Sequence, residues 1–163
     1  MVATLYLSSS DFEIKEDDNI LKMCTKIPGM SMICFYSTQC EHCADLVPIF
    51  KQLPLMHQGC QFGLINVGKH RNHNIIQASQ QTNTPLTHVP FIIMYINGYP
   101  YMKFDDNPTP ENLIKFIKHV SDEQKQTLSF TNDKYKHKIG TYGILDHNKI
   151  CNVRICDLVP SKN

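Results

Sequence analysis

Short apolar runs alternate with more polar segments along most of the chain. The run at 31–36 is apolar at almost every position, which is typical of a central strand covered on both faces. Runs of similar length predict further strands at 4–8, 62–67, 91–96 and 99–104. The last two flank Asn97-Gly98, a dipeptide that favours a type I′ turn, so they predict a β-hairpin.

Segments with apolar residues at helical spacing lie between these strands. They predict helices at 11–25, 44–53 and 74–81, and a last helix that opens at Pro110. In the first of these, Phe12, Ile20, Leu21 and Met23 would form the buried side, with Ser10 or Asp11 as the cap. The resulting order βαβαβαββα predicts an α/β protein with a mixed central sheet and helices on both faces.

The segment Cys40-Glu41-His42-Cys43 carries the strongest chemical signal. It separates the buried strand at 31–36 from the helix at 44–53. Cys40 would therefore stand at a helix N-terminus, where unpaired amides and the positive end of the dipole stabilise a thiolate. Cys43 would lie one turn later, close enough to resolve a mixed disulfide. We interpret the pair as a redox dithiol.

Composition and charge exclude several classes of protein. The 163 residues suit one domain, and 16 basic against 15 acidic side chains give no field that would attract nucleic acid or an anionic membrane. The apolar runs are too short for a membrane helix, and the start lacks the basic segment of an export signal. Seven cysteines, an odd number without framework spacing, indicate a reducing compartment. These features predict a cytoplasmic protein. We expect no cofactor.

From about Ala3 to Val120 the chain resembles the thioredoxin-like superfamily. The resemblance rests on the Cys40/Cys43 dithiol, Pro48 five residues after it, the Val89-Pro90 pair before a strand, and Asn97-Gly98. His42 before the second cysteine is more similar to the protein disulfide isomerase variant than to classical thioredoxin. The expected fold is thus a thioredoxin fold with a C-terminal extension.

The resemblance implies roles for several residues. Cys40 would be the exposed attacking sulfur and Cys43 the buried resolving one. Pro90 would be cis, and the backbone of Val89 would pair with an extended substrate segment as an added edge strand. Substrates would be cysteine-containing proteins.

The chain also departs from the family pattern beside the dithiol. Cys34 stands where the family has a buried acid, and Leu64 lies near the position of its lysine partner. General-base assistance is typically worth 10² to 10⁴ in rate, so turnover is expected to be slow. Glu41 opposes a Cys40 thiolate, whereas a protonated His42 favours it.

Other interpretations of the cysteines stay open. The dithiol could be inert, or it could form half of a zinc site completed by Cys151 and Cys156, although the spacing in that Ile/Val-rich stretch favours packed thiols over a zinc knuckle. We therefore predict no metal. Cys24, Cys34 and Cys60 are expected to be buried small apolar residues.

Residues 121–163 lie outside the resemblance and are predicted to form a separate extension after a domain at 1–120. Their apolar part, at 139–159, would add a hairpin to the sheet edge or form an arm that binds another protein.

Two functions follow. The first is a thiol-disulfide oxidoreductase. The alternative is a docking module of a larger assembly, in which the extension binds and the dithiol is secondary. The short AT-biased chain is also similar to thioredoxin-like proteins of large DNA viruses; that similarity implies a capsid or core partner and a place in the virion.

Overall fold

The computed structural model describes residues 3–127, 139–143 and 151–152. Its three helices are α1 (Glu41–Met56), α2 (His73–Ser79) and α3 (Pro110–Thr127), with short 3-10 turns η1 (Ser9–Asp11) and η2 (His70–Asn72). The strands are β1 (Leu5–Leu7), β2 (Phe12–Asp17), β3 (Ile20–Thr25), β4 (Met30–Tyr36), β5 (Gln61–Asn66), β6 (His88–Val89), β7 (Phe91–Ile96), β8 (Tyr99–Phe104), β9 (Gly140–Tyr142) and β10 (Cys151–Asn152).

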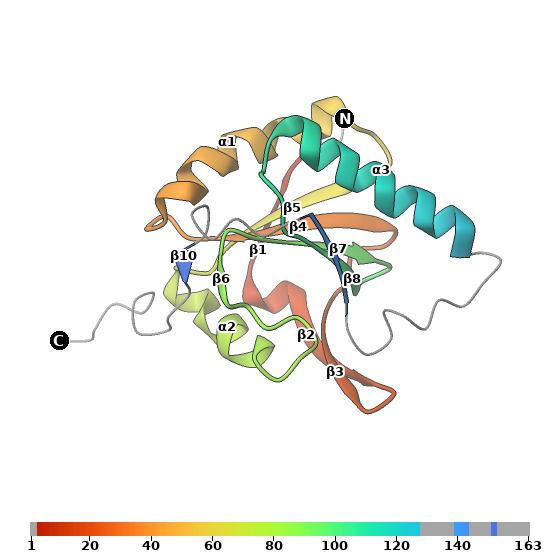
Figure 1. Ribbon diagram of the computed structural model, residues 1–163. Helices are drawn as coiled ribbons and strands as arrows, with labels where there is room; N and C mark the ends of the chain where they lie inside the picture. The colour runs from red at the N-terminus through yellow and green to blue at the C-terminus, as the bar shows by residue number, and fades with distance from the viewer. Residues whose placement is uncertain (1–2, 128–138, 144–150, 153–163) are drawn as a thin grey trace.

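A six-stranded mixed sheet forms the centre of the molecule, in the order β1-β5-β4-β7-β8-β9 (Figure 1). Strands β1, β5 and β4 are parallel, β7 runs antiparallel to β4, and β8 runs antiparallel to β7. The first five strands have the order and directions of a thioredoxin fold. The predicted fold class is therefore confirmed.

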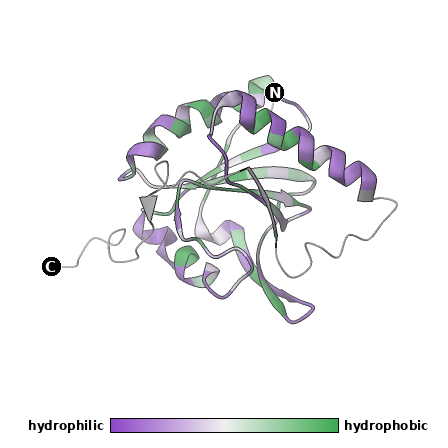
Figure 2. Cartoon of the chain, in the orientation of Figure 1, coloured by the Kyte–Doolittle hydropathy of each residue, from purple (hydrophilic) through white to green (hydrophobic). Residues whose placement is uncertain are grey.

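Each face of the sheet carries its own core. Along β4, Met32 and Cys34 point toward α1 and α3, whereas Ile33 and Phe35 point toward α2 and the β2-β3 hairpin, because successive strand residues face opposite ways. Figure 1 shows these two layers on either side of the sheet. Apolar and polar segments alternate along α1 and α3 in Figure 2, as expected for helices with one buried side.

The helix predicted at 11–25 is wrong, because this segment forms the antiparallel hairpin β2-β3. Asp18 and Asn19 have φ values of 52° and 63°, and positive φ at both central positions defines the type I′ turn of a two-residue hairpin. Phe12 still reaches the core, where its ring lies 5.5 Å from that of Phe35. The hairpin thus covers the sheet face that was expected to lie under a helix.

The hairpin β7-β8 has the predicted bounds and the predicted turn. Asn97 and Gly98 adopt φ values of 50° and 86°, and the Gly98 carbonyl accepts a 2.8 Å hydrogen bond from the Thr25 amide. The turn therefore holds the end of β3 against the central sheet.

Beyond the predicted boundary at Val120, α3 continues to Thr127 and β9 pairs parallel with β8. Tyr142 of β9 stacks on Phe104 and Phe116, with ring centroids 6.1 and 5.2 Å away. The described part of the extension forms two strands that pair with β8 and β6, not with each other. The predicted separate extension thus supplies a strand of the central sheet, and the rest of 121–163 lies outside the described residues.

Gly98 and Gly59 provide a matched test of how closely the turn packs. Both have φ near +87°, but a Cβ at Gly98 would collide with the Thr25 carbonyl oxygen, whereas nothing lies within 4 Å of one at Gly59. Gly59→Ala should lower the free energy of unfolding by about 1–2 kcal/mol through backbone strain. Gly98→Ala should lower it by about 1–3 kcal/mol more through the collision, as measured by urea unfolding. Equal losses would show that β3 does not depend on this contact.

Candidate active site

Cys40 occupies the N-cap of α1, directly after the buried strand β4. Its amide donates to the Ser37 carbonyl at 3.2 Å, and the Gln39 amide donates to Ser37 Oγ at 3.1 Å, so a tight turn carries the chain from strand to helix. The N-cap backbone is extended, with φ −101° and ψ 119°. Cys40 therefore stands at the N-terminus of a 16-residue helix, where the first backbone amides have no partner within the helix.

Cys43 lies one turn further along α1 and is 1% exposed. Burial raises the pKa of its thiol strongly, and a hydrogen bond with Cys40 raises it further, while a hydrogen bond with the Ser37 backbone opposes both. The two thiols are thus in contact, and Cys43 is held in its protonated form. This asymmetry suits an attacking sulfur at Cys40 and a resolving sulfur at Cys43.

Val89 and Pro90 face this dithiol. The peptide bond between them is cis, as the resemblance implies, and the Cys40 thiol lies 3.7 Å from the Val89 carbonyl oxygen with the geometry of a donated hydrogen bond. The structure therefore brings together the four residues to which the sequence assigned attack, resolution and substrate binding. Their roles in a reaction remain predictions.

The expected exposure of Cys40 is wrong, because the residue is only 4% exposed. Its side chain packs in the same core cluster as Cys43, Val89 and Phe91. The edge of Val89 is also occupied, since β6 pairs antiparallel with β10 and Cys151 stands opposite Val89. This strand from the C-terminal extension takes the position that the resemblance gives to a substrate.

Glu41 and His42 border the dithiol from the first turn of α1. Glu41 is exposed, while His42 is half-buried and lines a hollow of about 210 Å³ together with Pro90.

The opposite wall of this hollow is the segment from Asn107 to Pro110, which sequence reasoning missed. Pro108, two residues before the proline that begins α3, was the available signal. Thr109 caps that helix, because its Oγ accepts a 3.1 Å hydrogen bond from the Asn112 amide.

Cys34 lies behind the dithiol and is fully buried beside Leu64, which is its partner in the parallel pairing of β4 with β5. Burial raises the pKa of the Cys34 thiol, and the charge of Cys40 raises it further. Cys34 and Leu64, which stand at or near the positions where the resemblance implies an ionic pair, are therefore groups that stay neutral in the core. Cys24 and Cys60 are also buried, as predicted.

Among the described side chains, no three His, Cys, Asp or Glu residues lie close enough together to hold a metal ion. The zinc alternative also involves Cys151 and Cys156, whose side chains lie outside the described residues. None of the helices in the described ranges is both long and apolar enough to cross a membrane.

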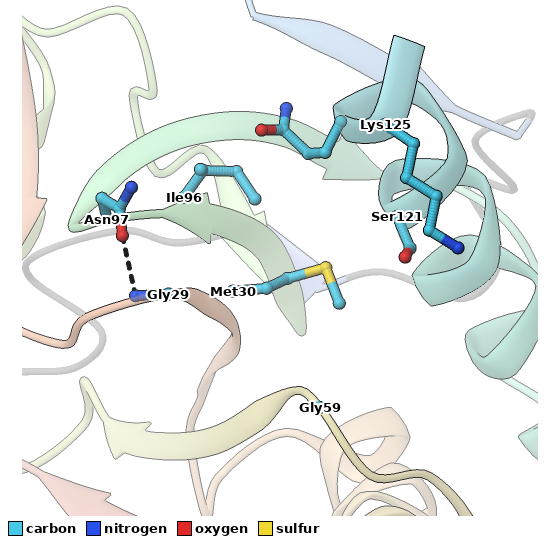
Figure 3. Close-up of a pocket in the computed structure, with 8 residues that line it drawn as sticks. Gly29, Met30, Gly59, Ile96, Asn97, Ser121 and Lys125 are labelled. Atoms are coloured by element: carbon cyan, nitrogen blue, oxygen red, sulfur yellow. Dashed lines mark hydrogen bonds between the residues drawn. The ribbon is translucent and has the colours of Figure 1, made fainter. Parts of the chain in front are cut away.

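A second hollow, of about 400 Å³, lies at the other end of the sheet (Figure 3). Met30 and Ile96 form its apolar side, Ser121 and Lys125 of α3 its polar side, and an Asn97 side-chain oxygen accepts a 2.9 Å hydrogen bond from the Gly29 amide at its rim. Met30 begins β4, whereas Cys40 follows the end of that strand. This hollow is therefore remote from the dithiol, and its lining contains no cysteine or histidine.

No model of a known protein family matches the chain. Two viral proteins are similar to it over most of its length. Uncharacterized protein 196R of Invertebrate iridescent virus 6 is 38% identical over 126 residues, which cover 72% of this chain and 70% of the viral protein. Uncharacterized protein 020R of Invertebrate iridescent virus 3 is 35% identical over 127 residues, covering 75% and 74%.

Solved structures superpose on part of the chain. Human ERp44 matches 55% of this chain and 27% of its own with 17% identity and a TM-score of 0.47. Mitochondrial thioredoxin 3 from Saccharomyces cerevisiae matches 58% and 81% with 22% identity and a TM-score of 0.46. A chain from a study of thiol resolution in yeast mitochondrial 1-Cys peroxiredoxin matches 58% and 81% with 21% identity and a TM-score of 0.45. The fold assignment itself rests on the strand order and directions described above.

The asymmetry of the dithiol predicts different reactivities. In the reduced chain at pH 7, iodoacetamide should label Cys40 faster than Cys43, because burial raises the pKa of the Cys43 thiol and leaves little of its thiolate to react. Labelling of Cys43 should keep rising above pH 9, since its pKa is raised in the folded chain. Peptide mass mapping over time measures both rates. Equal rates at pH 7, or faster labelling of Cys43, would reverse the assignment of the two sulfurs.

Proposed function

The chain belongs to the family of the iridescent virus proteins 196R and 020R, and we propose that this member is a thiol-disulfide oxidoreductase acting on the cysteines of other proteins. The observation that carries the proposal is the approach of Cys40 Sγ, at the N-cap of α1, to the Val89 carbonyl at 3.7 Å. It joins a sulfur at a helix N-terminus to a strand edge that can hold an extended peptide.

The reaction has two steps in the reductive direction. The Cys40 thiolate attacks one sulfur of a substrate disulfide, forms a mixed disulfide and releases the other substrate sulfur as a thiolate. Cys43 then loses its proton and attacks Cys40 Sγ. A Cys40–Cys43 disulfide forms, and the second substrate sulfur leaves as a thiolate. The substrate gains two electrons and the dithiol loses two.

Two features of the structure support a slow second step. Burial raises the pKa of Cys43, so little of its thiolate is present at neutral pH. Cys34 and Leu64, the residues behind it, carry no carboxylate that could accept its proton. Resolution of the mixed disulfide therefore limits turnover in this proposal.

The alternative is a structural module that docks into a viral protein assembly and uses the dithiol little. The viral source of both relatives favours it. In that case the partner would be a capsid or core protein and the site of action the virion. Activity of the isolated chain separates the two functions.

Reduction of a protein disulfide such as that of insulin, with dithiothreitol as donor, tests the oxidoreductase. Cys40→Ser should abolish the catalysed rate, because the attacking sulfur is lost. Reduced Cys43→Ser, mixed with insulin in the absence of dithiothreitol, should accumulate the mixed disulfide. Cys60→Ser is the matched control: Cys60 is 3% exposed, and its thiol contacts the backbone of Gln61 and Met32, neither of which belongs to the site. If the unsubstituted chain reduces insulin no faster than dithiothreitol alone, the docking function stands instead.

A carboxylate that could accept the Cys43 proton can be introduced at position 34. Cys34→Asp should raise the turnover rate by about tenfold or more over the isosteric Cys34→Asn, since general-base assistance is typically worth 10² to 10⁴. Both variants bury a polar group in an apolar core, so each should lose about 1–3 kcal/mol of stability in urea unfolding. Equal turnover in two folded variants would mean that proton removal from Cys43 does not limit the reaction.

A further inference from the structure

A third hollow, of about 210 Å³, opens at the carboxyl ends of the parallel strands β1, β5 and β4. Leu7, Asn66 and Tyr36 line it, and each is the last residue of its strand. Ligands of open α/β sheets commonly bind outside the carboxyl ends of the strands. Among the described residues, this hollow shares no lining side chain with the one beside His42 and Pro90, so the two are separate.

The loop that follows β5 forms one wall of the hollow and is held in place by hydrogen bonds. Asn72 is 1% exposed; its side-chain amide donates to the Asn66 carbonyl at 2.9 Å, and its side-chain oxygen accepts a 2.9 Å hydrogen bond from the Ser9 amide. These bonds fix the loop to the turn that follows β1. Lys69 and Arg71, which line the hollow, therefore have a fixed backbone position before any ligand binds, and this lowers the entropy cost of binding.

Positive charge gathers at this hollow without a matching acid. The ammonium group of Lys51 lies 5.6 Å from the ring centroid of Tyr6, which lines the hollow together with Lys69 and Arg71. None of the described lining residues is acidic, and within the described ranges no carboxylate forms an ion pair with any of the three cations. Asp11, in the adjoining turn, accepts a 2.8 Å hydrogen bond from a backbone amide of that turn. The whole chain has a net charge of only +1, so this positive field is local and suits a small anion better than a long polyanion.

Two tyrosines line the same hollow. Tyr6 is 68% exposed, and an exposed aromatic ring beside cations can stack on a nucleobase. Burial raises the pKa of Tyr36, so its hydroxyl keeps its proton at neutral pH and adds no negative charge to the hollow. An inorganic phosphate or an acidic side chain would engage the cations and leave the Tyr6 ring uncovered, whereas a nucleotide engages both.

We propose that this hollow binds a free nucleoside phosphate. Lys69 and Arg71 hold its phosphate groups, because ammonium and guanidinium groups donate charge-assisted hydrogen bonds to phosphate oxygens. Tyr6 stacks on its base. The proposal does not depend on disulfide exchange at Cys40, and it gives the chain a binding function beside the proposed oxidoreductase.

Isothermal titration of the reduced full chain with ADP tests the proposal. ADP should bind at one site per chain. Lys69→Gln and Arg71→Gln should each weaken binding by about tenfold or more, because each removes a charge-assisted hydrogen bond. Lys26→Gln is the matched control: Lys26 is also exposed, has no ion pair among the described residues and does not line the hollow, so the affinity for ADP should be unchanged.

Ligands that lack one part of a nucleotide test how its two parts are held. Pyrophosphate should bind about fivefold or more weakly than ADP, because it has no base to stack. Tyr6→Leu should weaken the binding of ADP to the level of pyrophosphate and leave the binding of pyrophosphate unchanged. If pyrophosphate binds as tightly as ADP, or if Tyr6→Leu does not change the affinity for ADP, the nucleoside part of the proposal is wrong.

Thermal unfolding of each variant confirms that it is folded before its affinity is compared. If ADP does not bind the unsubstituted chain, or binds equally well to the folded Lys69→Gln and Arg71→Gln variants, the inference is wrong and the proposed oxidoreductase is unaffected. A single-stranded thymidine tetranucleotide that binds through the same residues about tenfold or more tightly than ADP would overturn the free nucleotide and assign the hollow to a nucleic-acid strand.

Discussion

The antiparallel pairing of β4 with β7 is the constraint on which the site depends. Antiparallel strands bring the end of one to the beginning of the other, and here Phe35 pairs with Phe91. The chain leaves β4 toward Cys40 and enters β7 from Pro90, so the dithiol and the cis-proline segment meet at one edge of the sheet. Any shift in this register would separate the Cys40 thiol from the Val89 carbonyl. Both cores of the sheet hold that register, because β4 contributes side chains to each.

The acidity of the buried thiols depends on the uncharged residues that pack behind the dithiol. Cys34 and Leu64 lie side by side in the sheet behind it, and neither offers a charge to Cys43. Desolvation then dominates the acidity of the buried thiols: it is the largest cause of the raised pKa of both Cys34 and Cys43. Cys40 occupies a different backbone position, because it caps α1. The two sulfurs of one motif thus differ in their place on the helix, and burial raises the pKa of the resolving one.

Local patterns predicted the central strands, the 97–98 turn and the place of the dithiol, since each depends on residues that are close in sequence. The segment at 11–25 shows the limit of such patterns. Its few apolar positions fit a helix about as well as a hairpin, and the turn propensity of Asp18-Asn19 decides between them. The burial of Cys40 and the β6-β10 pairing could not be predicted, because they depend on contacts between distant parts of the chain that leave no periodic signal. The wall at 107–110 contains a local signal in Pro108, but its position across the hollow from His42 depends on the same kind of distant contact.

The small size of the β6-β10 ladder determines how easily the backbone edge of Val89 becomes accessible to a peptide. It joins only two residues on each strand and shares no strand with the six-stranded sheet. Short, separate pairings lie at the low end of local stability, far below the free energy of global unfolding. Its backbone amides should therefore exchange with solvent hydrogen by local opening, while those of β4 and β7 exchange only when the whole domain unfolds. Access of a peptide to Val89 is then a strand replacement governed by a small opening free energy, and the rigid sheet that positions Cys40 need not move.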